Sequence, residues 1–519
     1  MIDRRKHRCT VATVIIAATA FLGQAAPNRP ANEKFTISRE TTLIDGPVNT
    51  DGTIHYLQAI NDLLGKGIKA EENAAVLILS VAPDGKWNAQ KRLAALNVPA
   101  AAPGAPHLTA FEAAYFKAKG IKPSDATADE MQKESELEEQ LCTRPWKAAD
   151  HPETAAWLKD NEQALRVVEE GCARPRWFSP WVPKGDSTAA WDAIPDIGVY
   201  RFVARVLTTR AMLWAGERDF NGAVADIRRA RAMARFAEQE HMAAGRLASI
   251  SAELYAMRAF AALAGCDWLS MDQLQATRKE IESLPHFSDA DPTLPVVEKM
   301  LGLDVVMMCI RGDGERLMRG LAYELDETKP VNIGDLEKGD WDVLMRELLR
   351  LSDALYSRPA RKFEDSLRDI EAEQNSPVVR DLPLTLPANG VPVSHVADVE
   401  AFLRMRDGET RQAFSQRLAY WWVLGDPGTR RTGLLINELS RMARGIALVA
   451  VSLGEYRLDH GKYPESLESM GKPVLRDSIS GKNILYRKEG PGFVLWSVGA
   501  NGVDDGGGPG DLSFHVGSP

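Results

Sequence analysis

The chain has 519 residues, of which 45% are hydrophobic and 26% charged, and its formal net charge at pH 7 is −9. A chain of this length is too long for one ordinary hydrophobic core, so we expect more than one domain. The acidic balance, with basic and acidic residues interspersed, argues against nucleic acid or an anionic membrane as a general partner, since either needs a concentrated positive field.

The N-terminus predicts export. A basic start (Arg4, Arg5, Lys6 and Arg8) precedes an uncharged, largely apolar run over Thr10–Leu22, and Gly23 and Ala25 supply the small residues of a cleavage site. The apolar run of about 13 residues is shorter than the ~20 that span a bilayer, which predicts a cleaved signal peptide at residues 1–25. No later run that is both uncharged and apolar approaches spanning length, so we expect a mature chain without an integral membrane span, in the periplasm, the extracellular space or the cell envelope.

Helical periodicity dominates the rest of the chain. We expect an N-terminal region of extended chain and short helices at 26–106, in which Ile54–Leu64 and Glu71–Val81 are helical and 83–106 is a loop. A helical domain at 107–374, a Pro-rich connection at 375–395 and a helical continuation at 396–444 follow. The predicted helices are Ala110–Lys119, Ala128–Leu141, Pro152–Gly171, Val199–Ala215, Asn221–Gln239, Met242–Leu263, Met271–Leu284, Pro295–Leu317, Trp341–Tyr356, Val396–Arg406 and Glu409–Leu424. The expected fold class is mainly α. We expect an array of antiparallel helical hairpins, for which a repeat-like arrangement is left open, followed by a small α+β module at 445–519.

One predicted hairpin has a recognisable pattern. A helix that ends near Gly216 is followed by Phe220–Ala223 and then by Ile227 and Ala230, small and apolar residues at offsets that let two helices pack closely. This segment resembles the second helix of a tetratricopeptide (TPR) repeat. We find no second copy at the 34-residue spacing that such repeats use. The pattern therefore predicts one TPR-like hairpin near 199–239 within a helical array.

Two segments carry side chains of types that occur in binding or catalytic sites. The loop at 174–195 holds Trp177, Trp181 and Trp191, which are either a ligand platform or aromatic residues that pack the loop on the helices. The acidic run Glu134–Glu139 is interpreted as a solvated helix face.

The pattern changes after residue 445. A helix over Ile446–Leu458 is followed by two short runs with alternating apolar residues, Ile484–Arg487 and Phe493–Val498, and then by a glycine-rich tail. Glycine turns between such runs predict a small antiparallel sheet packed on the helix.

This segment carries Tyr456, Arg457, Asp459, Gly461, Tyr463 and Pro464, and then the loop Ser497-Val498-Gly499-Ala500-Asn501-Gly502. In the order of these motifs it resembles the globular domain of the type II secretion major pseudopilin, the G family, over about an eighth of the chain. The whole chain looks like long helical exported bacterial proteins of unassigned function that end in this module. In place of the family's leader and membrane-spanning helix, this chain has the predicted signal peptide and a long helical segment. Gly433 and Glu438 imitate the leader's spacing, but Arg441 and Arg444 interrupt the apolar stretch, so the resemblance does not imply a filament subunit.

The resemblance implies calcium in the acidic glycine loop. The residues that would supply side-chain oxygens are Asn501, Asp504, Asp505 and Asp511, and a hard cation prefers six to eight oxygen ligands of this kind. Asn501 stands where the family usually has an aspartate, and its neutral amide weakens the attraction for Ca²⁺. The alternative is a solvated glycine-rich tail.

The sequence assigns no catalytic residue. It contains no HExxH, GxSxG, GxxxxGK[ST] or GxGxxG motif in a suitable context. Of its cysteines, Cys142, Cys172, Cys266 and Cys309 follow the signal peptide; we expect buried thiols, with the pairing of any disulfide left open. The expected function is that of an exported, non-enzymatic interaction or scaffold protein with an unknown protein partner. The alternative is an envelope hydrolase or carbohydrate-active enzyme with a site between helices near 174–195.

Overall fold

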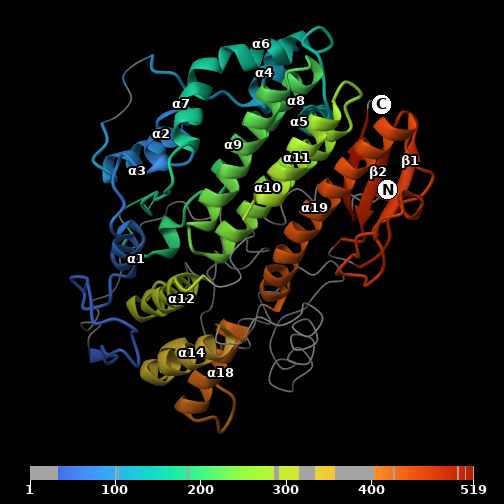
Figure 1. Cartoon of the computed structure of the whole chain (residues 1–519). Helices are drawn as coiled ribbons and strands as arrows, with labels where there is room; N and C mark the ends of the chain where they lie inside the picture. Colours follow the sequence, from blue (N-terminus) through green and yellow to red (C-terminus); the bar gives the residue numbers. More distant parts are fainter. Residues whose placement is uncertain are drawn as a thin grey trace. The chain divides into compact units, whose positions relative to one another are not determined.

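The fold was analysed in a computed structural model of the chain, which is mainly helical with a small antiparallel sheet at the C-terminal end (Figure 1). This confirms the prediction of a mainly α fold with a small sheet at the C-terminal end. The structure describes residues 33–517 except 84, 100–101, 103, 184, 186, 286–290, 315–333, 357–402, 425–426, 500–501 and 509. The predicted signal peptide at 1–25 and Pro-rich connection at 375–395 lie outside the described residues, as do most of the helix expected at Val396–Arg406. Its described residues, 403–406, are not helical.

The described residues form two compact units that interleave along the chain. The first takes its residues from Met1–Lys66, Pro180–Pro195 and Ala290–Leu434, and the second from Gly67–Ser179, Asp196–Asp289 and Leu435–Pro519. Each of the segments predicted at 107–374 and 396–444 contributes residues to both units. Sequence periodicity locates helices, but it does not show which helices pack together.

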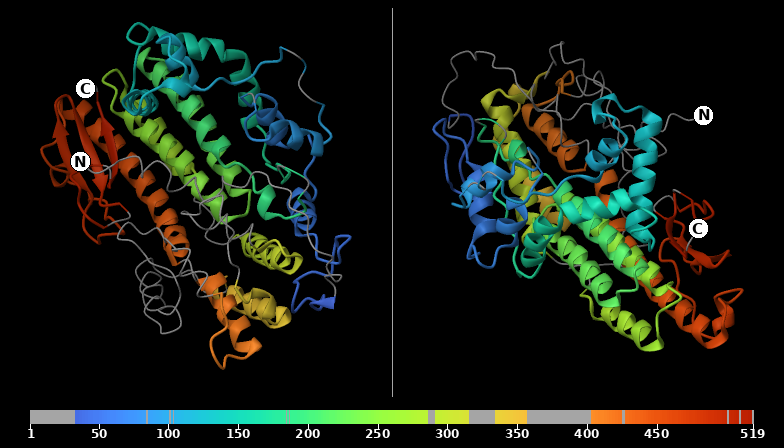
Figure 2. Two further views of the ribbon diagram at one scale, coloured as in Figure 1. Left: turned by 180° about the vertical axis from the view of Figure 1, so that it is seen from behind. Right: turned by 90° about the horizontal axis from the view of Figure 1, so that it is seen from above.

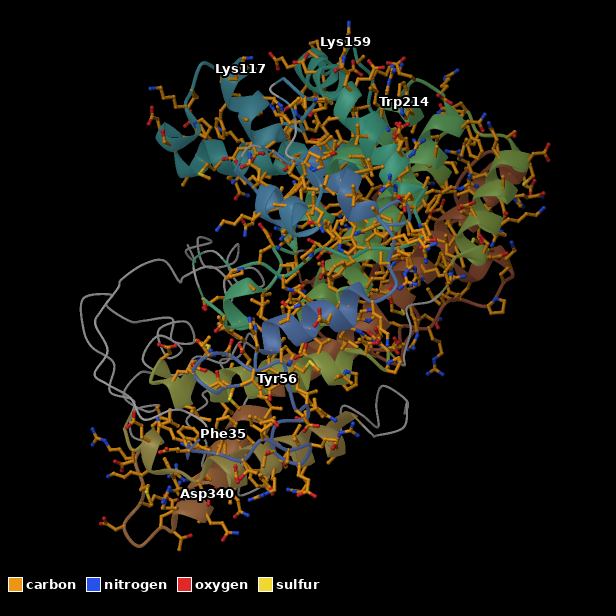
Figure 3. The ribbon with its side chains drawn as sticks, turned by 90° about the vertical axis from the view of Figure 1, so that its left-hand side faces the viewer. Phe35, Tyr56, Lys117, Lys159, Trp214 and Asp340 are labelled. Carbon is orange, nitrogen blue, oxygen red and sulfur yellow. The ribbon has the colours of Figure 1, made fainter. Side chains whose placement is uncertain are left out.

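The first unit is built on four helices. They are α1 (Tyr56–Gly65), α12 (Leu294–Arg311), α14 (Trp341–Tyr356) and α18 (Arg411–Leu424), with 3-10 turns η5 (Trp191–Ala193) and η6 (Leu336–Lys338). Helix α1 packs on α12, α12 on α14, and α14 on α18. Phe35 and Tyr56, labelled in Figure 3, are both buried, and the Tyr56 hydroxyl donates to the carbonyl of Thr42 at 2.7 Å. Helix α12 ends earlier than expected because Gly312 adopts a left-handed conformation, with φ of 93°.

The second unit opens with short helices. They are α2 (Ala74–Ser80), α3 (Ala89–Ala95), α4 (Phe111–Ala118), the 3-10 turn η4 (Pro123–Asp125), α5 (Ala128–Thr143), α6 (Pro152–Asp160) and α7 (Glu162–Cys172). Helix α3 lies inside the expected loop, and the single helix expected at 152–171 is two helices. The break falls at Asn161, whose side chain accepts from the Thr109 amide at 2.8 Å and donates to the Trp157 carbonyl at 2.9 Å.

Four helices form the centre of the second unit. Helices α8 (Gly198–Gly216), α9 (Phe220–Glu238) and α10 (Ala243–Ala264) pack against one another, and α11 (Met271–Ser283) follows (Figure 2). Asp219 caps the N-terminal end of α9: its side chain accepts from the Gly222 amide at 2.9 Å. Among the described residues, α10 alone is long and apolar enough to cross a membrane, and 72% of that stretch is buried inside its unit.

The chain ends in a helix and a three-stranded sheet. Helix α19 (Pro427–His460) and the 3-10 turn η7 (Glu468–Met470) precede β1 (Leu485–Glu489), β2 (Gly492–Ser497) and β3 (Leu512–Val516), which pair antiparallel in the order β1-β2-β3. Strand β3 lies in the segment that was predicted to be a glycine-rich tail. Phe514 and Val516 of β3 are buried, and the strand packs against α10.

Arg457 and Tyr463, at the end of α19 and just after it, have a structural role. Arg457 donates to the carbonyls of Gly265 and Cys266, at 2.8 and 2.6 Å, and to the Tyr463 hydroxyl at 3.0 Å. Gly265 follows the last residue of α10, so this guanidinium satisfies carbonyls that the helix end leaves without helical partners. Tyr463 in turn lies edge-on against Phe493 of β2. Arg457 thus links α19, α10 and the sheet.

Candidate functional site

The predicted metal loop is shaped by its own hydrogen bonds. Asp511, which is 8% exposed, accepts through Oδ2 from the amides of Asp505 and Gly507, at 3.0 and 2.7 Å. Asp504 is exposed, and its Oδ1 accepts from Trp496 Nε1 at 3.0 Å and from the Gly506 amide at 2.9 Å. These hydrogen bonds lower the pKa of Asp504, the bond from Trp496 most of all.

Only part of the predicted set fits a cation. Asp511 Oδ1 and Ser497 Oγ are buried and have no hydrogen-bond partner among the described residues, so each is an oxygen that a cation would satisfy. Asp504 is directed to Trp496 instead, and Asn501 lies outside the described residues. Within the described part of the chain, no three His, Cys, Asp or Glu side chains gather as a metal would require. Asp511 is therefore the one predicted ligand whose geometry favours an ion.

The tryptophan loop packs its aromatic residues inward. Trp177 and Trp181 are 2% and 1% exposed. Trp177 stacks on Phe236 with ring centroids 5.4 Å apart, and its Nε1 donates to Glu240 at 2.9 Å. Tyr200 donates to the same carboxylate oxygen. Of the two alternatives left by the sequence, these contacts favour packing over a ligand platform for both tryptophans.

The acidic run on α5 is not a solvated face. Glu134 is 7% exposed, Glu138 pairs with Arg205, and Glu139 pairs with Arg258 at 2.9 Å. Burial raises the pKa of Glu138, and the charge of Arg205 opposes that shift. The prediction was wrong because a charge run on one helix does not reveal the arginines that neighbouring helices α8 and α10 supply.

A pocket that the sequence analysis did not identify lies in the second unit. It has a volume of about 330 Å³, and its lining comes from the end of α7 and the residues after it, from one face of α9 and from the end of α11. The lining residues are Cys172, Arg174, Pro175, Arg228, Arg231, Ala232, Arg235, Phe236, Gln239, Glu280 and Leu284. We call this the arginine pocket.

The face of α9 explains how the sequence builds the arginine pocket. Arg228, Arg231 and Arg235 are three and four positions apart, which places them on one side of a helix. That spacing was the available signal, and the interspersed acids hid it. Arg228 pairs with Glu280 of α11, while Arg231 pairs with the buried Glu253 of α10 at 3.2 Å.

The arginines also hold the end of α11. Arg231 and Arg235 both donate to the carbonyl of Pro285, the former at 2.7 Å, and Arg444 donates to the carbonyls of Glu282 and Leu284 at 2.6 and 2.7 Å. A helix C-terminus carries partial negative charge, so cations are favourable there. Arg231 and Arg235 also have carboxylate partners, Glu253 and Glu238, which offset their charges.

The chemistry of the arginine pocket suits binding. Glu280 is the one carboxylate among its lining residues, which include no histidine, and that glutamate is paired with Arg228. Burial raises the pKa of the Cys172 thiol to about 12, so the thiolate nucleophile is not populated at neutral pH. The lining therefore offers hydrogen-bond donors, positive charge and an apolar wall rather than an acid, a base or a nucleophile.

Cys142, Cys172, Cys266 and Cys309 are free thiols in the structure, and Cys142, Cys266 and Cys309 are buried.

Comparison of the chain with protein-family models, with curated proteins and with solved structures gives no match.

Proposed function

We propose that this chain is an exported, non-enzymatic interaction protein that holds a ligand or a partner's side chain in the arginine pocket. The observation that carries the proposal is the composition of the pocket: four arginines, one paired glutamate and an unreactive thiol around about 330 Å³. Pockets of about this size and larger hold small ligands. Helix α9 supplies one wall of the arginine pocket. We propose that the hairpin α8–α9 to which it belongs is TPR-like, because of its small residues.

We further propose that the C-terminal module has a pseudopilin-like fold stabilised by calcium. The support is the buried oxygen Asp511 Oδ1, which has no hydrogen-bond partner, together with Ser497 Oγ. In this proposal the ion has a structural role, in which it would hold the loop against β2 and β3. The residues for the shell would be Asp511 and Ser497 with backbone carbonyls, rather than all four residues that the sequence suggested.

The alternative of a hydrolase near 174–195 has less support. That site needs a pair of convergent carboxylates or histidines, whereas Glu240, the carboxylate beside Trp177, accepts from both Trp177 and Tyr200 in the buried core.

Site-specific photo-crosslinking tests the interaction function. A benzophenone amino acid replaces Pro175, which is exposed at the pocket, or Lys159, which is exposed on α6 and labelled in Figure 3. The mature protein is irradiated in envelope extract and its adducts are identified by mass spectrometry. We expect adducts at position 175 that are missing at position 159. The same adducts at both positions, or none at position 175, would overturn the proposal.

A further inference from the structure

We infer that the arginine pocket recognises a small organic oxyanion, a phosphate monoester or a carboxylate attached to a compact apolar group. This inference rests on the proposed function above and specifies its ligand. Arginine is suited to both groups, because its planar guanidinium can donate two parallel hydrogen bonds to a carboxylate or a phosphate.

The charge of the lining favours an anion. Three of the four guanidinium groups in the lining pair with carboxylates: Arg228 with Glu280, Arg231 with Glu253 and Arg235 with Glu238. The four arginines thus exceed these three carboxylates by one positive charge. Arg174 donates through Nη1 to the carbonyls of Ala70 and Asn73, both at 2.8 Å, and these bonds fix its position without neutralising its charge. The contacts set the guanidinium groups in place before any ligand binds, which lowers the entropic cost of binding.

The arginines also repel one another. The pKa of Arg231 is lowered by burial first, and the charges of Arg235 and Arg444 lower it further while Glu253 opposes the shift. Burial likewise lowers the pKa of Arg444; the charges of Glu253 and Glu282 oppose that shift, and Arg235 adds a smaller contribution of the same sign as burial. An anion that enters between Arg231 and Arg235 would relieve this like-charge repulsion. Ligand binding should therefore stabilise the second unit as well as fill the pocket.

The wall of the pocket favours an apolar body on the ligand. Phe236 and Leu284 line it and are 3% and 8% exposed, and Ala232 and Pro175 add further apolar surface. A bare anion would leave this surface in contact with water. A volume of about 330 Å³ has room for a ring or a short chain beside the oxyanion.

A purely structural role for the arginines is the competing explanation, since Arg231 and Arg235 hold the end of α11 together with Arg444, which lies outside the lining. The two explanations differ at Arg174 and Arg228, which are not bound to the carbonyls of residues 282–285 in the structure. Arg228 is 58% exposed and Arg174 lies on the segment after α7, so replacing either changes the pocket with little effect on the helix end.

Isothermal titration calorimetry on the mature protein tests the inference, with phenyl phosphate, benzoate, inorganic phosphate and benzyl alcohol as probes. The proteins are the wild type, Arg174→Gln, Arg228→Gln and the control Arg166→Gln, an exposed arginine on α7 that is paired with Glu162 outside the pocket. We expect phenyl phosphate or benzoate to bind at least tenfold more tightly than both benzyl alcohol and inorganic phosphate. The two pocket variants should weaken that binding at least fivefold, and the control by less than twofold.

The preferred probe distinguishes the two sources of oxyanion, since tighter binding of phenyl phosphate identifies a phosphate monoester and tighter binding of benzoate a carboxylate. Equal binding of benzyl alcohol, or unchanged affinity in both pocket variants, would overturn the inference. If position 175 still crosslinks to a partner while no oxyanion binds, the ligand class is wrong and the interaction function stands. If neither occurs, both fail.

Discussion

Arg210 and Asp226 form a two-point ion pair between α8 and α9, in which Nε and Nη2 of the arginine each lie 2.6 Å from a carboxylate oxygen. Asp226 is fully buried, and Trp214 Nε1, on the side chain labelled in Figure 3, donates to the same carboxylate at 3.1 Å. Asp226 lies on α9, two positions before Arg228. This ion pair therefore fixes the helix that carries three of the pocket's four arginines.

Replacing Asp226 with Asn should destabilise the second unit strongly. The change removes one carboxylate from Arg210 and leaves Glu169, at 2.6 Å, as its charged partner. Loss of a partner from a buried pair costs up to about 3–5 kcal/mol, and Glu169 should reduce that cost. Urea unfolding followed by circular dichroism measures the loss. As a control, Asp129→Asn breaks an exposed pair with Lys133 and should change the free energy of unfolding by less than about 1 kcal/mol. Equal losses in the two variants would contradict the structural role assigned to Asp226.

Gly216→Ala should also destabilise the second unit, for a steric reason. A Cβ at this position would lie 1.9 Å from the carbonyl oxygen of Trp146, so the backbone of one segment would have to move. Overpacking of this kind costs about 1–3 kcal/mol or more. Gly185→Ala is the matched control, since its Cβ would meet nothing within 4 Å. We expect a melting temperature near that of the wild type for Gly185→Ala and a clear decrease for Gly216→Ala.

The stability of the first unit should depend on pH through Asp304. Burial raises the pKa of this carboxyl to about 7, and the charge of Arg311, 4.0 Å away, opposes the shift together with the amides of Trp191 and Ala190. In the unfolded chain the group ionises near pH 4, so the stability present below pH 4 is lost as the pH rises to about 7 and is then constant. The slope approaches about 1.4 kcal/mol per pH unit.

Asp304→Asn removes this titration. The stability of the variant relative to the wild type should rise between pH 4 and pH 7 and level off above it, as measured by urea unfolding at one-unit intervals. Asp353→Asn, a change at an exposed carboxylate paired with Lys299, is the control and should change the free energy of unfolding by less than about 1 kcal/mol. A flat difference for Asp304→Asn would show that the buried carboxyl does not titrate in this range.

Calcium should raise the melting temperature of the mature protein through Asp511. Removal of calcium by a chelator should lower it again, because the ion would satisfy the buried Oδ1 that has no hydrogen-bond partner. Asp511→Asn should abolish most of the calcium-dependent shift. Asp459→Asn, at an exposed residue of the same module, should retain it. A shift of equal size in all three proteins would place the calcium elsewhere or show a general salt effect.

The helices were the part of the fold that the sequence predicted best. Helix α14 begins and ends at the predicted residues, Trp341 and Tyr356, because its apolar residues recur with a clear helical period. The break at Asn161 was missed because it depends on Thr109, far away in the sequence. Strand β3 was missed because its short apolar alternation follows a run of glycines.

The candidate site was predicted less well, for a related reason. The spacing of Arg228, Arg231 and Arg235 was visible in the sequence, but the pocket also needs Arg174 from the segment after α7 and Glu280 from α11. Those contacts exist only after the helices have packed. For the metal loop, residue types indicated four ligands, whereas backbone amides occupy Asp511 Oδ2 and an indole occupies Asp504 Oδ1.

Arg457 binds carbonyls at the end of α10, and this contact limits whether the C-terminal segment can be transplanted onto another protein. Gly454 of α19 lies so close to α10 that a Cβ there would be 2.7 Å from the Ala264 carbonyl, and Arg278 of α11 binds Glu455 at 2.8 Å. A graft of residues 445–519 onto another protein would leave its arginine without these carbonyls and its apolar helix face without cover. A motif that resembles an independent domain in sequence is here an inseparable part of a larger helical core.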